Sequence, residues 1–246
     1  SMIQTDEKRL SWQDSVNQRY QAGEWRSPIF KDLVIDSLGA DSTVLDIGCG
    51  HGFDHNSELQ SEISGHCSRF IGIEPDNEIE IPGYFHECHL STLENAPLEP
   101  DSIDVAYSAF VLEHVADPIE FWGAVHRSLK PGGVFWGFTV DGRHPFRMAS
   151  DLLETFRLKD AYLRCVQGVR GDDRYENYPT FYRCNSPGQI QKKAAIFSSL
   201  DFLTLHRPGQ LDFYFPRFVR PITRAAEAVW SSTGMPGSVL LVKATK

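Results

Sequence analysis

The stretch that decides the fold is VLDIGCGHG, residues 44–52, where a short apolar run ends in three glycines at alternate positions. Residues 44–47 have the composition of a buried strand. Glycine loses more conformational freedom on folding than other residues, so three of them in five positions indicate that the backbone must be bare there. A strand that passes through a glycine-rich turn into a helix lets a ligand approach the backbone amides. We therefore expect a binding turn at Gly48, Gly50 and Gly52.

Strands and helices alternate around this turn. A helix is expected from Ser27-Pro28 to Gly39, and another from Pro118 to about Leu129. The expected strands are residues 44–47, 69–74, 84–89, 102–110, 134–140, 201–207 and 238–244. This order predicts an α/β fold, a doubly wound, Rossmann-like and mostly parallel seven-stranded sheet with helices on both faces. Such a sheet binds its ligand at the carboxyl ends of the strands.

The chain is expected to form a single domain with four parts. Residues 1–40 would form an N-terminal helical lid and residues 41–140 the cofactor-binding core. Residues 141–187 break the alternation and are interpreted as an inserted cap, or substrate segment. Residues 188–246 would complete the sheet, and they include an amphipathic helix broken near Pro221. That helix would carry a stripe of Arg217, Arg220 and Arg224, which could face an anionic ligand, a membrane surface or simply solvent over a buried apolar face.

Composition excludes several classes of protein. The 246-residue chain has a formal net charge of −9, which gives no general attraction for nucleic acid. Its five cysteines are scattered and form no C-x-x-C pair, so neither a disulfide framework nor a zinc knuckle is indicated. No apolar run approaches the length of a membrane span, and the N-terminal stretch is polar. We expect a cytoplasmic protein with no membrane span, and composition gives no oligomeric state.

An acidic residue follows the glycine turn at an informative distance. Glu74 ends the second expected strand, where a carboxylate can accept both hydrogen bonds of a ribose diol. Dinucleotide-binding turns place a third glycine where this chain has Phe53, and Gly52 gives G-x-G-x-G instead. The strand, the glycine turn and the acid together indicate an adenosine-containing ligand.

In these motifs the sequence resembles the class I S-adenosylmethionine-dependent methyltransferases. VLDIGCGHG and FIGIEPD look like the first two motifs of that family. APLEPDSIDVAYSAFVLEHVADP and SLKPGG look like the stretch through the fourth strand and the turn before the fifth. The resemblance covers about residues 43–140 and implies S-adenosyl-L-methionine as cofactor, with S-adenosyl-L-homocysteine as product. It also implies a final antiparallel strand at the sheet edge, supplied by SVLLVKA.

The resemblance also assigns cofactor-binding residues. Asp46, Gly48, Cys49, Gly50 and Gly52 would line the methionine end, with Ser108 nearby at the end of the fourth strand. Glu74 would hold the ribose, and Pro75 would lie beside the adenine. Thr92 occupies a position that is usually acidic in the family and could make only part of that contact to the adenine amino group, whereas Leu93 could touch the ring.

Two histidines are candidate catalytic bases. His114 follows the fourth strand and His144 lies in the cap, and an imidazole titrates near ~6.5, so either could accept a proton from a hydroxyl nucleophile. Structural roles for both histidines remain open at this point. The candidate substrate residues are Phe110, Tyr178, Tyr182 and Arg183.

A metal site is not expected. In HECH, residues 86–89, an extended strand would put only two of the four side chains on either face, too few for zinc. Glu113 beside His114 would also need a third ligand that the sequence does not supply.

The expected function is methyl transfer from S-adenosylmethionine to the oxygen, nitrogen or carbon of a small molecule. The fourth strand ends in YSAF and has no Asn/Asp-Pro-Pro-aromatic motif, which argues against methylation of nucleic-acid base amines. The alternatives are a protein or RNA methyltransferase, a regulatory module that binds the cofactor without catalysis, and a nicotinamide-dependent oxidoreductase, against which Phe53 argues.

Overall fold

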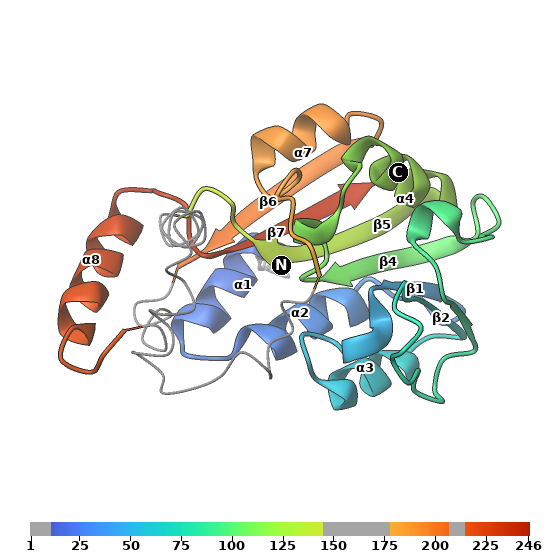
Figure 1. Ribbon diagram of the computed structural model, residues 1–246, viewed down its shortest axis with the longest axis horizontal. Helices are drawn as coiled ribbons and strands as arrows, with labels where there is room; N and C mark the ends of the chain where they lie inside the picture. The colour runs from blue at the N-terminus through green and yellow to red at the C-terminus, as the bar shows by residue number, and fades with distance from the viewer. Residues whose placement is uncertain (1–10, 145–177, 207–214) are drawn as a thin grey trace, which may run out of the picture.

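A seven-stranded sheet forms the centre of the molecule (Figure 1). The structure is a computed structural model that describes residues 11–144, 178–206 and 215–246. The strand order is β3-β2-β1-β4-β5-β7-β6, with β1 to β5 parallel and β7 antiparallel to both of its neighbours. The strands are β1 Thr43–Ile47, β2 Arg69–Ile73, β3 Glu87–His89, β4 Ile103–Ala109, β5 Leu129–Val140, β6 Ser199–Leu205 and β7 Val239–Thr245. The doubly wound, mostly parallel α/β fold expected from the sequence is confirmed.

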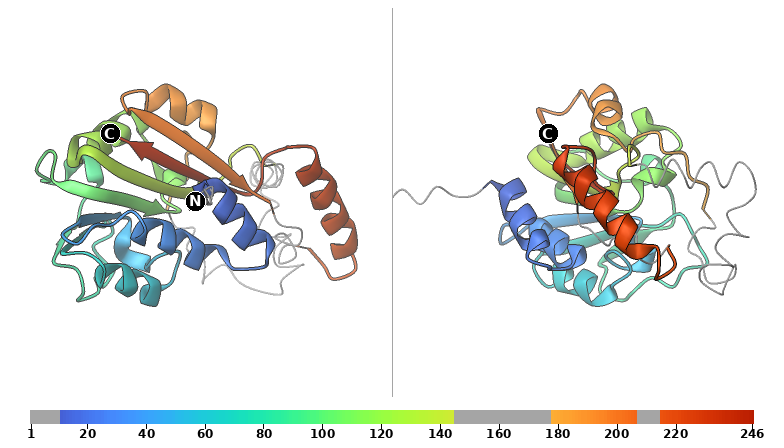
Figure 2. Two further views of the ribbon diagram at one scale, coloured as in Figure 1. Left: turned by 180° about the vertical axis from the view of Figure 1, so that it is seen from behind. Right: turned by 90° about the vertical axis from the view of Figure 1, so that its left-hand side faces the viewer.

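Helices cover both faces of the sheet (Figure 2). On one face α1 (Trp12–Gln21), α2 (Arg26–Ile35) and α3 (Ser57–Ser64) share a core with the side chains of Val44 and Tyr107. On the other face α4 (Pro118–Ser128) and α7 (Pro187–Lys193) pack over Leu45 and Ile47. Successive residues of β1 therefore point to opposite cores, as the period of a strand requires.

The expected N-terminal helices contribute buried side chains to this architecture. Ile29, Phe30 and Val34 of α2 are fully buried, and the Phe30 ring stacks on Phe138 of β5 at 4.4 Å between centroids. α2 is thus part of the core, and the movement that a lid implies stays a prediction. Most of the expected cap, residues 145–177, lies outside the described residues.

Two late elements differ from expectation. The strand over SVLLVKA is antiparallel, as expected, but β7 lies between β5 and β6, so the edge position was wrong and β6 holds that edge. The late helix, α8 (Arg220–Ser232), has Pro221 in its first turn, where proline's missing amide hydrogen costs nothing. Pro221 therefore starts the helix and does not break it, and Arg217 precedes α8, so the three arginines form no single helical stripe.

The PGG turn at residues 131–133 interrupts the pairing of β5. Leu129 pairs with Ile103 and the register resumes at Val134 with Val105, so four residues of β5 lie opposite a single residue of β4. Gly132 has a φ of 78°, in the left-handed region that favours glycine. The predicted turn is therefore present as an irregularity inside the strand.

The chain reverses direction in the sheet beside β1. It passes from β1 out to β2 and β3, then crosses back to β4 on the other side of β1. The carboxyl ends of β1 and β4 thus flank the crevice where sheets of this type bind ligands. The glycine turn lies at this point.

Candidate functional site

The glycine turn leaves no room for side chains. Gly48 and Gly52 have φ values of 79° and 78°, and the short helix η1 (Cys49–His51) lies between them. A Cβ on Gly48 would lie 2.5 Å from Val111 Cγ2, and one on Gly52 would lie 2.8 Å from the backbone of Asn56. Both positions therefore need glycine, because of the backbone conformation and because of the close neighbours.

Glu74 is held against this turn. Its Oε2 accepts a hydrogen bond of 2.9 Å from the Gly50 amide, and its Oε1 accepts one of 2.9 Å from the Asp76 amide. The residue is only 5% exposed, and a Cβ on Gly50 would lie 2.7 Å from Oε2. A carboxylate oxygen has a further acceptor site after one such bond. Glu74 can therefore bind hydroxyl groups of a ligand while keeping its place beside Gly50.

Asp46 lies beneath the turn in a polar network that the sequence does not reveal. Its Oδ2 accepts hydrogen bonds from Gln60 Nε2 at 2.6 Å and from the Tyr107 hydroxyl at 2.5 Å. Gln60 also donates to the Cys49 carbonyl at 2.9 Å and accepts from the Tyr84 hydroxyl. Burial raises the pKa of Asp46 to about 7, against the opposing effect of its two donors. The network fixes the turn from below.

The thiol of Cys49 faces a second thiol. Its Sγ lies 3.9 Å from Cys88 Sγ on β3, and burial raises the pKa of both cysteines. A Cβ on Gly72 would lie 2.6 Å from Cys49 Sγ, so Cys49 fills the space that this glycine leaves. Both thiols are therefore uncharged packing groups at neutral pH.

His114 and Tyr178 meet across the crevice. Tyr178 donates its hydroxyl hydrogen bond to Asp76, two residues beyond Glu74, and its ring lies 6.1 Å from His114 and 6.4 Å from His51 between centroids. His114 Nδ1 lies 3.1 Å from the Pro179 carbonyl. That carbonyl can only accept, so Nδ1 donates to it, and in the neutral tautomer Nε2 is the acceptor nitrogen. Two predicted residues are thus brought together.

Phe110 adopts an unusual conformation at the end of β4. Its φ is 58°, a region that non-glycine residues seldom occupy, and the Arg26 guanidinium lies 4.3 Å from its ring centroid. Arg26 also pairs with Asp54, whose own φ is 50°. Sequence reasoning missed Arg26 and Asp54, because these residues are 28 positions apart and meet only through packing of α2 on the turn.

Glu113 anchors the segment that carries Tyr182. Its carbonyl accepts hydrogen bonds from the Phe181 amide at 2.7 Å and the Tyr182 amide at 3.2 Å. Its buried carboxyl accepts one of 2.7 Å from Thr139, which in turn accepts from Asn185. Burial raises the pKa of Glu113. The short helix η3 (Leu112–His114) is therefore tied both to β5 and to residues 181–185.

His144 and Arg183, two further predicted residues, contact other parts of the chain. His144 is buried with its ring 6.4 Å from that of Trp230, and burial lowers its pKa. Arg183 donates to the Ala116 carbonyl at 2.6 Å and lies over the Phe181 ring. The catalytic role of His144 and the substrate role of Arg183 stay predictions.

The predicted adenine-side residues follow β2 and β3. Pro75 is exposed directly after Glu74, and Thr92 precedes the short helix η2 (Leu93–Asn95), where its hydroxyl accepts from Asn95 at 3.0 Å. Leu93 is buried in the core on the α4 face. Ser108 is fully buried at the end of β4, and its hydroxyl has no partner among the described residues.

His86 of HECH has a local partner. His86 Nδ1 accepts a hydrogen bond of 3.0 Å from the Phe70 amide. Within residues 11–144, 178–206 and 215–246, no group of three side chains is placed to hold a metal ion.

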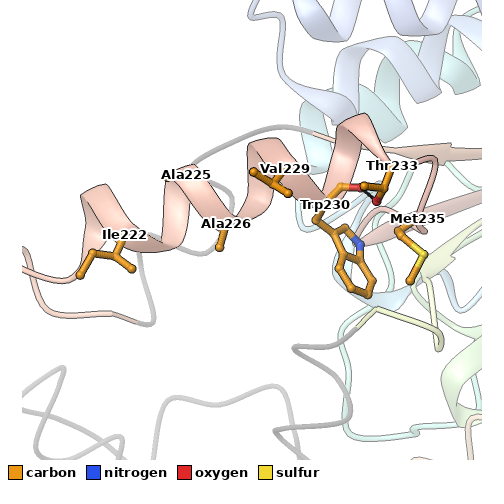
Figure 3. Close-up of a pocket in the computed structure, with 7 residues that line it drawn as sticks. All are labelled: Ile222, Ala225, Ala226, Val229, Trp230, Thr233 and Met235. Atoms are coloured by element: carbon orange, nitrogen blue, oxygen red, sulfur yellow. Dashed lines mark hydrogen bonds between the residues drawn. The ribbon is translucent and has the colours of Figure 1, made fainter.

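An open hollow of about 630 Å³ lies along α8, away from the sheet (Figure 3). Its lining is Ile222, Ala225, Ala226, Val229, Trp230, Thr233 and Met235. This surface comes from one helix and the turn after it, and its polar side-chain groups are the Thr233 hydroxyl and the Trp230 indole N–H, which donates to the Pro236 carbonyl. It offers no groups for chemistry, so we place the candidate site at the glycine turn.

Comparison with known proteins gives matches to methyltransferases. Residues 45–137 match a family model described as a methyltransferase domain. A ubiquinone biosynthesis O-methyltransferase from Ruegeria pomeroyi is 32% identical over 127 residues, 50% of either chain. A tRNA U34 carboxymethyltransferase from Shewanella sediminis is 30% identical over 132 residues, 48% of this chain and 39% of that protein. The chain spans half or less of the length of these curated relatives.

A solved structure shares the fold. Geranyl diphosphate C-methyltransferase from Streptomyces coelicolor, in complex with Mg²⁺, geranyl diphosphate and S-adenosyl-L-homocysteine, has a TM-score of 0.54. The match covers 98% of this chain and 85% of that one at 15% identity.

Among the described residues, no helix is long and apolar enough to cross a membrane.

Proposed function

We propose that this chain is a class I S-adenosylmethionine-dependent methyltransferase and that it transfers the methyl group of S-adenosylmethionine to a small-molecule acceptor. The observation that carries the proposal is Glu74, a buried carboxylate held against the amide of the glycine turn at 2.9 Å. This is the pairing of bare backbone and ribose-binding acid that an adenosyl ligand requires.

The residues of the crevice suit this cofactor. The buried Ser108 hydroxyl has no hydrogen-bond partner in the described part of the chain. Buried polar groups usually have one, so a bound ligand would supply it. Asp46 offers a carboxylate for the cationic methionine end, and Gly48 and Gly52 leave the backbone open. S-adenosylmethionine, when bound, supplies an activated methyl group on a sulfonium. The residues of the crevice are therefore consistent with the proposed family.

The protein's own contribution is alignment and exclusion of water. Holding nucleophile and methyl carbon in line can supply ~7–11 kcal/mol of the barrier. Tyr178 is hydrogen-bonded to Asp76 and lies near His114. Its ring would therefore shield both the cofactor and the acceptor from water. The Nε2 of His114 would accept the proton of an oxygen nucleophile, since its Nδ1 is bound to the Pro179 carbonyl. A carbon or amine acceptor would not need this step.

The acceptor is proposed from charge and enclosure. The net charge of −9 supports a small molecule over a tRNA, and Phe110, Tyr178 and Arg26 supply aromatic and cationic surface beside the turn. The relatives act on acceptors of several classes by name, including a tRNA. RNA or protein methylation is therefore the second candidate, and cytoplasmic location stays a prediction.

A thermal-shift panel tests the proposal. S-adenosylmethionine, S-adenosylhomocysteine and NAD are each added to the purified chain, and unfolding is followed by fluorescence. At 100 times its dissociation constant an adenosyl ligand should add about 2.7 kcal/mol to the free energy of unfolding. We expect this for the first two ligands and no shift with NAD.

The contrary results are equally clear. Stabilisation by NAD alone would replace the proposal with a nicotinamide-dependent function. Binding of S-adenosylmethionine without transfer of its labelled methyl group to a metabolite extract, tRNA or protein would indicate a regulatory module. Label found in tRNA or protein would replace the small-molecule acceptor.

A further inference from the structure

The carboxyl of Asp46 is buried, and its surroundings decide whether it is ionised. It is 3% exposed, and both of its hydrogen bonds, from Gln60 and Tyr107, reach Oδ2. In the part of the chain that the structure describes, no donor is placed on Oδ1. One oxygen is therefore committed to the protein, and the other is free to hold a proton or to face a cation.

The groups around Asp46 do not compensate its negative charge. Tyr107 comes from β4, Gln60 from α3, Tyr84 from the loop before β3, and the thiols of Cys49 and Cys88 from η1 and β3. Burial raises the pKa of both phenols and both thiols, so all four are neutral at pH 7. The carboxylate of Glu74 repels a negative charge on Asp46 and so raises its pKa further. No cation of the described residues offsets Asp46 there.

We propose that Asp46 releases a proton to solvent when S-adenosylmethionine binds and takes one up again when the sulfonium is lost, so that the network distinguishes the methyl donor from its product by charge. The inference rests on the proposed function. S-adenosylmethionine brings a sulfonium and an ammonium toward one carboxyl, whereas the product keeps the ammonium alone. A buried carboxyl ionises more readily beside a cation, because the attraction offsets its lost hydration.

The pH range follows from the environment of the carboxyl. Burial raises the pKa of Asp46 from an ordinary value of 3.8 to about 7 in the ligand-free protein. A raised pKa means that this group stabilises the ligand-free fold most at low pH, and that the contribution is lost as pH rises through 7. A cationic ligand favours the ionised form, so its affinity rises over the same range.

Calorimetric titration tests the proposal directly. S-adenosylmethionine is titrated into the protein at pH 6, 7 and 8, each in two buffers of different ionisation enthalpy, which gives the number of protons released. We expect release of roughly half a proton per cofactor at pH 7, and a dissociation constant roughly tenfold higher at pH 6 than at pH 8. S-adenosylhomocysteine should show a smaller change in both quantities.

Two variants separate Asp46 from other titrating groups. Asp46→Asn keeps a similar shape but cannot ionise, so any proton exchange that remains belongs to the ligand or to other residues and is subtracted. Tyr107→Phe removes a donor from Oδ2 and so raises the pKa of Asp46 further. In that variant we expect proton release at pH 8 to exceed the wild-type value, a change that a merely structural role of Tyr107 would not produce.

Failure of this inference and failure of the proposed function give different results. Equal affinities at pH 6 and pH 8, or proton release that is the same in wild type and in Asp46→Asn, would overturn the inference while leaving cofactor binding in place. Absence of any binding of S-adenosylmethionine would instead remove the proposed function. If Asp46→Asn does not fold, unchanged proton release in Tyr107→Phe at pH 8 would by itself overturn the inference.

Discussion

Glu74→Ala abolishes the thermal stabilisation by S-adenosylmethionine and S-adenosylhomocysteine while the chain still folds. The carboxylate is expected to accept two hydroxyl hydrogen bonds from the ribose, and bonds to a charged group contribute about 1.5–3 kcal/mol each. Their loss corresponds to at least a 100-fold weaker affinity, since each 1.4 kcal/mol is about tenfold. Calorimetric titration of wild type and variant measures the difference.

A matched control removes a carboxylate elsewhere. Glu99 is exposed in the loop before β4, so Glu99→Ala should leave both stability and cofactor affinity at wild-type values. Circular dichroism shows whether Glu74→Ala is folded, because the amides of Gly50 and Asp76 lose their acceptor in that variant. A folded Glu74→Ala protein with unchanged affinity would remove the ribose assignment.

Gly50→Ala should be nearly as damaging to binding, although it adds a single methyl group. The new Cβ would lie 2.7 Å from Glu74 Oε2 and 2.9 Å from Ile79 Cγ2, so the carboxylate must move away from the turn. The backbone at residue 50 has no positive φ, so alanine can adopt its conformation without backbone strain. We expect a 10- to 100-fold loss of cofactor affinity, about 1.4–2.7 kcal/mol, with little loss of stability.

Gly123→Ala is the control for this substitution. Gly123 lies inside α4, and a Cβ there would meet nothing within 4 Å. Alanine in a helix interior is favoured over glycine by roughly 1 kcal/mol, so the control should be slightly more stable and bind normally. Equal affinities of the Gly50→Ala and Gly123→Ala proteins would show that the contact of Gly50 with Glu74 does not govern binding.

The sequence predicted those parts of the site that depend on local order along the chain. Gly48, Gly50 and Gly52 follow β1, and Glu74 directly follows β2. These positions meet because the carboxyl ends of neighbouring parallel strands lie at one edge of the sheet. The glycines that follow one expected strand and the acid that ends the next therefore sufficed to predict the turn and its acid. The same is true of the fold, whose parallel strands follow from the alternation of strands and helices.

Contacts between distant residues could not be predicted in this way. The hydroxyl of Tyr107 reaches Asp46 across 61 positions, and Arg26 reaches Asp54 across 28, so only tertiary packing brings these groups together. The edge of the sheet was misjudged for a related reason, since strand order at the C-terminal end depends on how β6 and β7 pair and not on their composition.

The most direct test of the central claim is a crystal structure of the protein with S-adenosylhomocysteine. The account predicts that the ligand lies across Gly48–Gly52, with its ribose hydroxyls within hydrogen-bonding distance of the Glu74 carboxylate. A ligand found elsewhere on the protein, or one whose ribose does not contact Glu74, would contradict it.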